Sequence, residues 1–295
     1  MATLKALRDR RKTIQSTQKI TMAMKMVAGA KLRRAQEHVE AGRPYAYYMR
    51  QMLKDLAVNV QALETPQPLL TGRGKDSIHL ILVATSDRGL CGPFNSSLVR
   101  QTRKLVESLR GNGKSVQICT IGRKGKDMLV REYGDLMVKS FMAVGQSRLQ
   151  FSDAQRIGDG VLSMFQDGLF DVCTLIYNHF KSALTQEVTV QQIIPVPIEV
   201  SEQVPSPDHK VVYEYEPDEE KILGQLLPQN VIVQIYNALL ESAASEQGSR
   251  MTAMDNASRN ADEMIRKLSL SYNRTRQAQI TRELSEIISG AEALQ

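Results

Sequence analysis

The two ends of the chain both show the three-then-four spacing of apolar residues that is typical of an amphipathic helix. Residues 229–294 contain no proline and only two glycines, Gly248 and Gly290. The apolar or small residues recur at Ile232, Ile235, Leu239, Ala243, Ala253, Ala257, Ala261, Met264, Leu268, Ala278, Leu284, Ile288 and Ala291. At 1.5 Å per residue, one helix over this segment would be about 100 Å long. A compact domain cannot cover such a helix, so we expect a partner of similar length.

Residues 1–63 carry a matching pattern. With Leu4 as position a of a heptad, the a positions are Leu4, Arg11, Gln18, Lys25, Leu32, Val39, Ala46, Leu53 and Val60. The d positions are Leu7, Ile14, Thr21, Ala28, Ala35, Gly42, Met49, Leu56 and Leu63. A seam sustained over this many heptads predicts a coiled coil. Thr3 is the expected N-cap, and Pro44 is expected to bend or interrupt the helix.

The two helical ends therefore predict one long antiparallel coiled coil, with the intervening chain packed at one end. The alternative is two separate amphipathic helices in an ordinary bundle, although globular helices rarely exceed roughly 25 residues. Arg11, Gln18 and Lys25 make the seam polar near the N-terminus. Polar residues in a seam weaken pairing, so we expect the helices to splay there or to touch a third surface.

The middle of the chain changes character at Glu64, where prolines and glycines break the helical pattern. Apolar runs predict strands at 78–84, 115–121, 136–142, 171–179 and 185–196, with a short strand at 211–215 after a loop at 201–208. Helices are predicted at 96–109, 126–131 and 153–166. This alternation predicts a mostly parallel sheet covered by helices. The predicted fold class is thus α/β: a Rossmann-like domain at 64–228 between coiled-coil helices at 1–63 and 229–295.

The loop after the first predicted strand stands where many α/β domains bind a nucleotide. Its glycines, Gly89 and Gly92, do not form GxGxxG, and Pro93 lacks the backbone donor that a phosphate cradle needs. Residues 122–126 are basic and glycine-bearing, but no acidic residue follows where a ribose or magnesium would need one. The chain also lacks GxxxxGK[ST], GxSxG and HExxH. The sequence therefore predicts a structural domain with no catalytic residue, no cofactor and no metal.

Cysteine and histidine spacing supports the same interpretation. Cys119 and Cys173 lie in apolar, strand-like runs and are expected to be buried thiols. The third cysteine is Cys91, and because the sequence contains no CxxC motif, neither a zinc site nor a redox switch is expected. The histidines, His38, His79, His179 and His209, show no ligand spacing and are expected to be structural or solvated.

Positive charge is concentrated at one end of the chain. Residues 1–35 hold ten Lys or Arg residues against Asp9 alone, whereas residues 229–295 hold seven basic and eight acidic residues. A basic surface favours an acidic partner, which could be a nucleic acid or acidic protein loops; a merely solvated face is the alternative. No apolar run is long enough to span a bilayer, and no secretory signal is expected.

Three segments carry a resemblance to the ATP synthase gamma-subunit family. They are residues 15–28 (QSTQKITMAMKMVA), residues 86–92 (SDRGLCG), and residues 272–291, which contain YNRTRQA and ITRELSEIISGA. The resemblance implies a central-stalk rotor inside a ring of three alpha and three beta subunits, in contact with the epsilon subunit and the membrane c-ring. It implies that the shaft transmits c-ring rotation to drive ATP synthesis and performs no chemistry itself. The implied location is peripheral, on the cytoplasmic face of a bacterial inner membrane.

The resemblance also implies roles for individual residues. Lys19, Met24 and Lys25 would face an acidic loop of the catalytic subunits, and Arg276 and Gln277 would form a polar catch on one of them, unless they are simply solvated. The residues of the C-terminal tip would turn in an apolar sleeve as a bearing: Ile287, Ile288, Gly290, Ala291 and Leu294.

Two other classes of function remain open on sequence alone. A nucleic-acid-binding coiled coil would use the basic end, which lacks aromatic residues for stacking, and its binding would depend steeply on salt. A dinucleotide-dependent enzyme would use the middle domain and would bind NAD or ATP in calorimetry.

Overall fold

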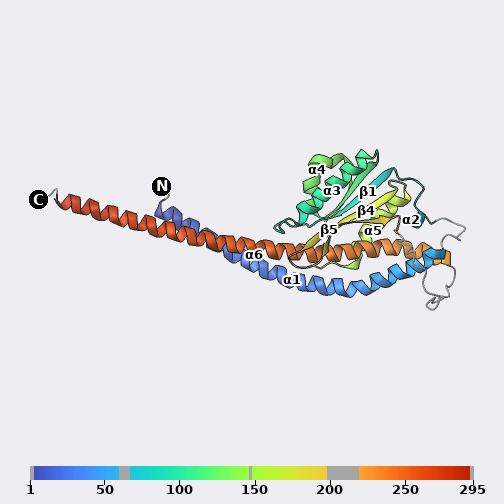
Figure 1. The fold of residues 1–295 in the computed structure, drawn as a ribbon, viewed down its shortest axis with the longest axis horizontal. Helices are drawn as coiled ribbons and strands as arrows, with labels where there is room; N and C mark the ends of the chain where they lie inside the picture. The colour runs from blue at the N-terminus through green and yellow to red at the C-terminus, as the bar shows by residue number, and fades with distance from the viewer. Residues whose placement is uncertain (1–2, 60–66, 146–147, 198–218, 293–295) are drawn as a thin grey trace. The chain divides into compact units, whose positions relative to one another are not determined.

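The computed structural model describes residues 3–59, 67–145, 148–197 and 219–292 (Figure 1). The chain divides into two structural units: residues 1–30 with residues 250–295, and residues 31–249. Two long helices, α1 (Leu4–Asn59) and α6 (Glu219–Glu292), contribute to both units. The predicted loop at 201–208 and strand at 211–215 lie outside the described residues.

The second unit contains a five-stranded sheet with the order β3-β2-β1-β4-β5. Its strands are β1 (Ile78–Ala84), β2 (Ser115–Ile121), β3 (Met137–Phe141), β4 (Val172–Phe180) and β5 (Gln186–Ile194). The first four pair in parallel, and β5 returns antiparallel to β4. The predicted α/β class with a mostly parallel sheet is therefore confirmed.

Helices connect these strands and cover the sheet. They are α3 (Phe94–Gly111), α4 (Arg123–Tyr133) and α5 (Phe151–Gln166), with a 3-10 turn at Gly134–Leu136. A four-residue helix that the sequence reading did not predict, α2 (Pro68–Thr71), begins at one of the prolines that were interpreted as a break. Proline suits that position because the first turn of a helix leaves its backbone donors unpaired.

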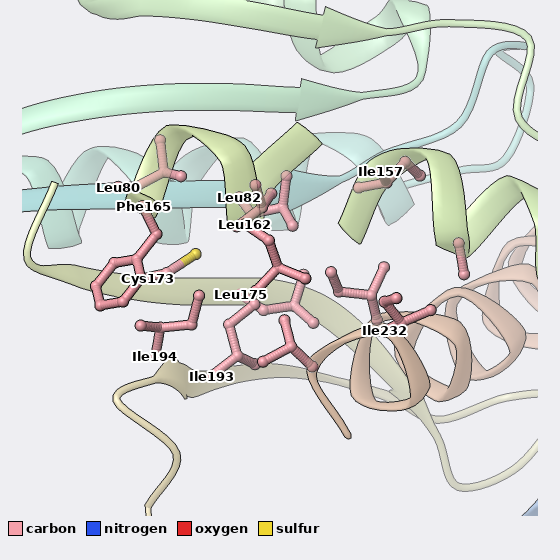
Figure 2. Close-up of a cluster of buried hydrophobic side chains, with 14 of the residues drawn as sticks. Leu80, Leu82, Ile157, Leu162, Phe165, Cys173, Leu175, Ile193, Ile194 and Ile232 are labelled. Carbon is pink, nitrogen blue, oxygen red and sulfur yellow. The ribbon is translucent and has the colours of Figure 1, made fainter. Parts of the chain in front are cut away.

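The core forms two layers because alternate residues of β1 point to opposite faces of the sheet. Leu80 and Leu82 pack into a layer shared with α5 and α6, whereas Ile81 and Val83 pack against α3 and α4. Figure 2 shows the first layer, where Ile232 of α6 lies among side chains of α5 and the sheet. The part of α6 in this unit is therefore a component of the domain core.

The heptad seam of α1 is confirmed by burial. Every a and d residue from Leu4 to Met49 is buried or half-buried, and most other positions are exposed. Thr3 accepts the backbone N–H of Ala6 at 3.3 Å through its side chain, as an N-cap does. Pro44 does not interrupt the helix, contrary to one of the two outcomes expected for it.

Helix α6 departs from the prediction at its start, at Met264, and at the predicted seam residues Ala278, Leu284 and Ile288, which are exposed. The helix begins at Glu219, and Pro228, which was expected to precede it, lies inside it. A proline inside a helix lacks the N–H that would donate to the carbonyl four residues earlier, here that of Gly224, so Pro228 removes one hydrogen bond without ending α6. Further along, Met264 is exposed and its neighbour Ile265 is half-buried, because the seam advances four residues from Ala261 and not three.

All three cysteines are buried thiols, as expected for Cys119 and Cys173. Burial raises the pKa of the Cys119 thiol to about 12 and also raises that of Cys173. Both groups therefore stay protonated at neutral pH, which makes them poor nucleophiles and poor metal ligands.

Candidate interaction surfaces on the long helices

Within the first unit, α1 and α6 run antiparallel in one fixed register. Arg8 donates to the hydroxyl of Tyr272 at 3.1 Å, and Gln18 donates to Asp262 at 3.4 Å. Further along, the ammonium of Lys25 contacts Asp255 at 2.5 Å. From one pair to the next, the residue number in α1 rises by as much as the residue number in α6 falls. The predicted antiparallel pairing is therefore confirmed, and its register is defined.

The polar a positions of α1 have partners on α6. Gln18 and Lys25 reach carboxylates, and the guanidinium of Arg11 lies 5.4 Å from the centre of the Tyr272 ring. A hydrogen bond from Arg8 lowers the pKa of Tyr272 from its ordinary value. The helices therefore do not splay at these residues, so that alternative was wrong, whereas contact with a third surface stays a prediction. Polar and cation–π contacts replace the apolar knobs that a regular seam would place there.

The pKa of Asp255 depends on its contact with Lys25 of the other helix. The hydrogen bond from Lys25 is the largest cause that lowers the pKa of Asp255, and Arg259 on the same helix adds to it. Because the carboxylate's pKa is depressed in the folded state, its contribution to stability is present above the unfolded pKa of about 3.9 and is lost as pH falls through the folded value.

We predict that Lys25→Met raises the pKa of Asp255 toward its ordinary value, because the largest stabilising contact of the carboxylate is removed. An NMR titration of the Asp255 carboxyl carbon in both proteins measures the shift. Glu263 is the internal control: Lys267 on the same helix lowers its pKa, and that titration should be unchanged. An unchanged Asp255 titration in the variant would show that the two helices are not paired in this register.

The outward face of α1 in this unit is both basic and apolar. Lys19 is exposed, Lys25 is half-exposed toward its ion pair, and Met24 is half-buried at the rim of the seam. Around them, four apolar side chains each expose more than half of their surface: Ile20, Met22, Met26 and Val27. The sequence analysis did not single out these four. Their positions outside a and d were the available signal, because large apolar residues there have no place in the seam.

The C-terminal part of α6 extends as exposed helix. Leu4, where α1 begins, stands in the pairing register opposite Arg276, and every described side chain from Arg276 to Gly290 is exposed. Arg276 and Gln277 thus lie at the end of the pair. The apolar residues beyond them are Ile280, Leu284, Ile287 and Ile288. Nothing is described for the Ala291 side chain or for Leu294.

The nucleotide-like loops of the second unit are already filled by protein atoms. Three consecutive N–H groups at the start of α4 donate to acceptors in the loop after β1: Arg123 to the Asp87 carboxylate at 2.8 Å, Lys124 to the Ser86 carbonyl at 3.0 Å, and Gly125 to the Thr85 hydroxyl at 2.8 Å. A phosphate would need these donors. The loops therefore bind each other, which argues against the dinucleotide-dependent enzyme.

Neither a metal-binding cluster nor a membrane-spanning helix is found among the described residues. Across 3–59, 67–145, 148–197 and 219–292, no group of three or more His, Cys, Asp or Glu side chains is placed to hold a metal ion. Over the same ranges, no helix combines the length and apolar character needed to cross a membrane.

Comparison with known proteins gives matches over the full chain. A family model described as ATP synthase matches residues 3–294. The ATP synthase gamma chain of Rhodospirillum rubrum is 54% identical over 301 residues, and that of Rhizobium etli is 52% identical over 297 residues; each alignment covers 100% of both chains. A chain in the cryo-EM structure of the Tetrahymena thermophila mitochondrial ATP synthase central stalk and c-ring has a TM-score of 0.63 at 33% identity, covering 81% of this chain and 99% of that one. A chain in the Euglena gracilis mitochondrial ATP synthase rotor shares the fold at 18% identity, with a TM-score of 0.65.

The fold and the matches together place this chain in the class of central-stalk proteins of rotary ATP synthases. The register of the helix pair agrees with that class, since a stalk needs two helices that cannot slide past each other. The chain belongs to the ATP synthase gamma-chain family.

Proposed function

We propose that this chain is the rotor shaft of a proton-translocating F-type ATP synthase, which transmits rotation of the membrane c-ring to a hexamer of alpha and beta subunits and holds no catalytic site of its own. The observation that carries the proposal is the match to bacterial gamma chains over the whole length of both proteins. The Tetrahymena structure, a central stalk with its c-ring, supports the same partners. The epsilon subunit is the further expected partner, and the cytoplasmic face of a bacterial inner membrane is the expected location, where the chain binds peripherally.

The charge difference between the two helices supplies a mechanism. On α1 the exposed basic residues, such as Lys5, Arg10 and Lys12, have few acidic neighbours. On α6, by contrast, Asp262 pairs with Arg266 and Glu263 with Lys267. A catalytic subunit beside the turning shaft would therefore meet a basic face and then a neutral one. Differential contacts of this kind shift the populations of binding, reacting and releasing states in turn.

Contact residues follow from this mechanism. Lys19 lies on the basic face that would meet an acidic loop of the catalytic subunits, and Met24 and Lys25 border that face at the seam. Arg276 and Gln277 are exposed at the end of the helix pair, where they could form a polar catch. The contact with Asp255 assigns Lys25 a second task, which is to fix the helix register beneath that face.

The exposed tip of α6 suits a bearing. Ile287 and Ile288 are exposed next to Gly290, and apolar contacts are non-directional. An apolar sleeve can therefore slide around them without breaking a hydrogen bond at each step. Ala291 and Leu294 complete the proposed bearing in sequence.

Co-purification tests the proposal most directly. The tagged chain is expressed with the alpha and beta subunits of the same organism, purified through the tag, and weighed as an intact assembly. We expect three alpha and three beta subunits per copy of this chain, with ATPase activity. Recovery of the chain without alpha and beta would refute the proposal.

We predict that Ile287→Asp combined with Ile288→Asp uncouples the assembled enzyme. Moving carboxylates into an apolar sleeve costs several kcal/mol, so ATP-driven proton pumping should fall by about tenfold or more. Pumping and hydrolysis are measured together in inverted membrane vesicles. Because both side chains are exposed, the isolated protein should melt as before. Met128→Asp with Val130→Asp, on exposed apolar positions of α4 that are less exposed than Ile287 and Ile288, is the control and should pump normally.

A further inference from the structure

A largely covered carboxylate on α6, that of Glu241, connects three elements of the second unit. The side chain of Glu241 is 13% exposed. Its Oε2 accepts the backbone N–H of Phe180 at 2.9 Å and lies 3.2 Å from Nδ1 of His179, both at the end of β4. Its Oε1 lies 3.7 Å from the guanidinium of Arg43 on α1. A carboxylate so removed from water is retained only when such partners compensate its desolvation.

Three buried serines continue this face of α6. Ser242 donates to the Ala84 carbonyl at 3.4 Å, Ser245 to the Asn178 carbonyl at 3.1 Å, and Ser249 to the Cys91 carbonyl at 2.6 Å. Close approach is possible because Gly248 lies between them: a Cβ at that position would be 3.2 Å from the Ala183 carbonyl oxygen. We call Glu241, Ser242, Ser245, Gly248 and Ser249 the α6 joint.

The acceptors of the α6 joint share a location. Ala84 ends β1, Cys91 lies in the loop that follows, and Asn178 is near the end of β4. Strands β1 and β4 are neighbours, and their carboxyl ends flank the point where the strand order of this sheet reverses. Open α/β sheets bind their ligands at such a point. In this chain the α6 joint occupies it.

We propose that Glu241 and the α6 joint are the positioning residues that carry torque from the α/β domain to α6; this rests on the proposed rotor function. Interdigitated apolar packing around Ile232 holds α6 against the sheet, and the α6 joint adds directional contacts to that packing. Hydrogen bonds are directional. The four polar members of the α6 joint, Glu241 and the three serines, contact groups on β1, β4, the loop after β1, and α1. Together they fix the rotation angle of α6 against the sheet.

The test uses the assembled enzyme in inverted membrane vesicles with Glu241→Ala and Glu241→Gln. The glutamine keeps an acceptor for the Phe180 N–H but loses the charge that faces Arg43 and His179. ATP hydrolysis and proton pumping are measured without a gradient and then against an imposed one. Glu132→Ala is the matched control, since Glu132 also pairs with an arginine, Arg103, but on the α3–α4 surface.

Without a gradient, we expect ATP hydrolysis within about twofold of the wild type for all variants. Against the gradient, the number of protons pumped per ATP should fall at least about threefold in Glu241→Ala and less in Glu241→Gln. It should not fall in Glu132→Ala. If Glu241→Ala fails to assemble, the double variant Ser245→Ala with Ser249→Ala removes only hydroxyls and should show the same loss under load. Normal pumping under load, or an equal loss of loaded and unloaded activity, would overturn the proposal. Failure of the wild-type chain to assemble with alpha and beta would instead overturn the rotor function itself.

Discussion

Replacing Gly122 by alanine is expected to destabilise the α/β domain severely. The backbone of Gly122 has φ +86°, which L residues rarely adopt, and its missing Cβ would overlap the Thr85 carbonyl oxygen and lie 2.8 Å from the Thr85 carbonyl carbon. Both neighbours are main-chain atoms of the segment that ends β1, so neither can rotate away. We expect a loss of about 4 kcal/mol or more, since steric overlap adds to backbone strain.

Gly113→Ala separates these two causes. Gly113 also has positive φ, +74°, but nothing lies within 4 Å of its missing Cβ. Its replacement should therefore cost only the conformational part, about 1–2 kcal/mol. Urea denaturation followed by circular dichroism measures both variants. Similar losses for Gly113→Ala and Gly122→Ala would show that the contact with Thr85 does not constrain the domain.

The elements that the sequence predicted best are those buried on both sides. The ends of β1 and β2 were predicted to the residue, because strands covered by helices on both faces read as continuous apolar runs. The edge strand β3 was predicted one residue too long at each end. An edge strand mixes apolar residues with charged ones such as Lys139, so its pattern marks the limits less sharply.

The seam of α6 shows the limit of periodicity. A helix of 3.6 residues per turn can advance by three or four residues at each step, and both Met264 and Ile265 are apolar. Only contact with α1 decides between them, and that contact comes from the opposite end of the chain. The same reason applies to Lys25, whose partner Asp255 could not be identified from spacing within either helix.

The hydrogen bonds between the loop after β1 and the start of α4 could not be predicted for a related reason, since they join segments that are distant in the sequence. Glycines and basic residues at 122–126 resemble an anion-binding turn, but their donors are satisfied by Thr85, Ser86 and Asp87 from another loop. On sequence alone the missing motif residues disfavoured a nucleotide site but left it open as an alternative. The structure supplies the physical reason, which is that the backbone donors are already paired.

The packing of α6 on α5 leads to the second large effect. A Cβ added at Gly158 would lie 2.6 Å from Cγ1 of Ile232, which is buried in the core shown in Figure 2. We predict that Gly158→Ala destabilises the protein by about 1–3 kcal/mol through overpacking, and that Ile232→Ala alone costs about 2–5 kcal/mol through the cavity it leaves.

Combining the two changes should cost clearly less than their sum, because Ile232→Ala removes the atom with which the new methyl group collides. Urea denaturation of the two single variants and the double variant gives the coupling free energy, which we expect to be about 1–2 kcal/mol. Gly160→Ala is the control on the same helix: its Cβ would face Lys139 and Phe141 instead, so it should add to Ile232→Ala without coupling. Strict additivity at Gly158 would mean that α6 does not pack on α5 as described. Coupling there would confirm that the long helix is part of the domain core, as a shaft driven through that domain requires.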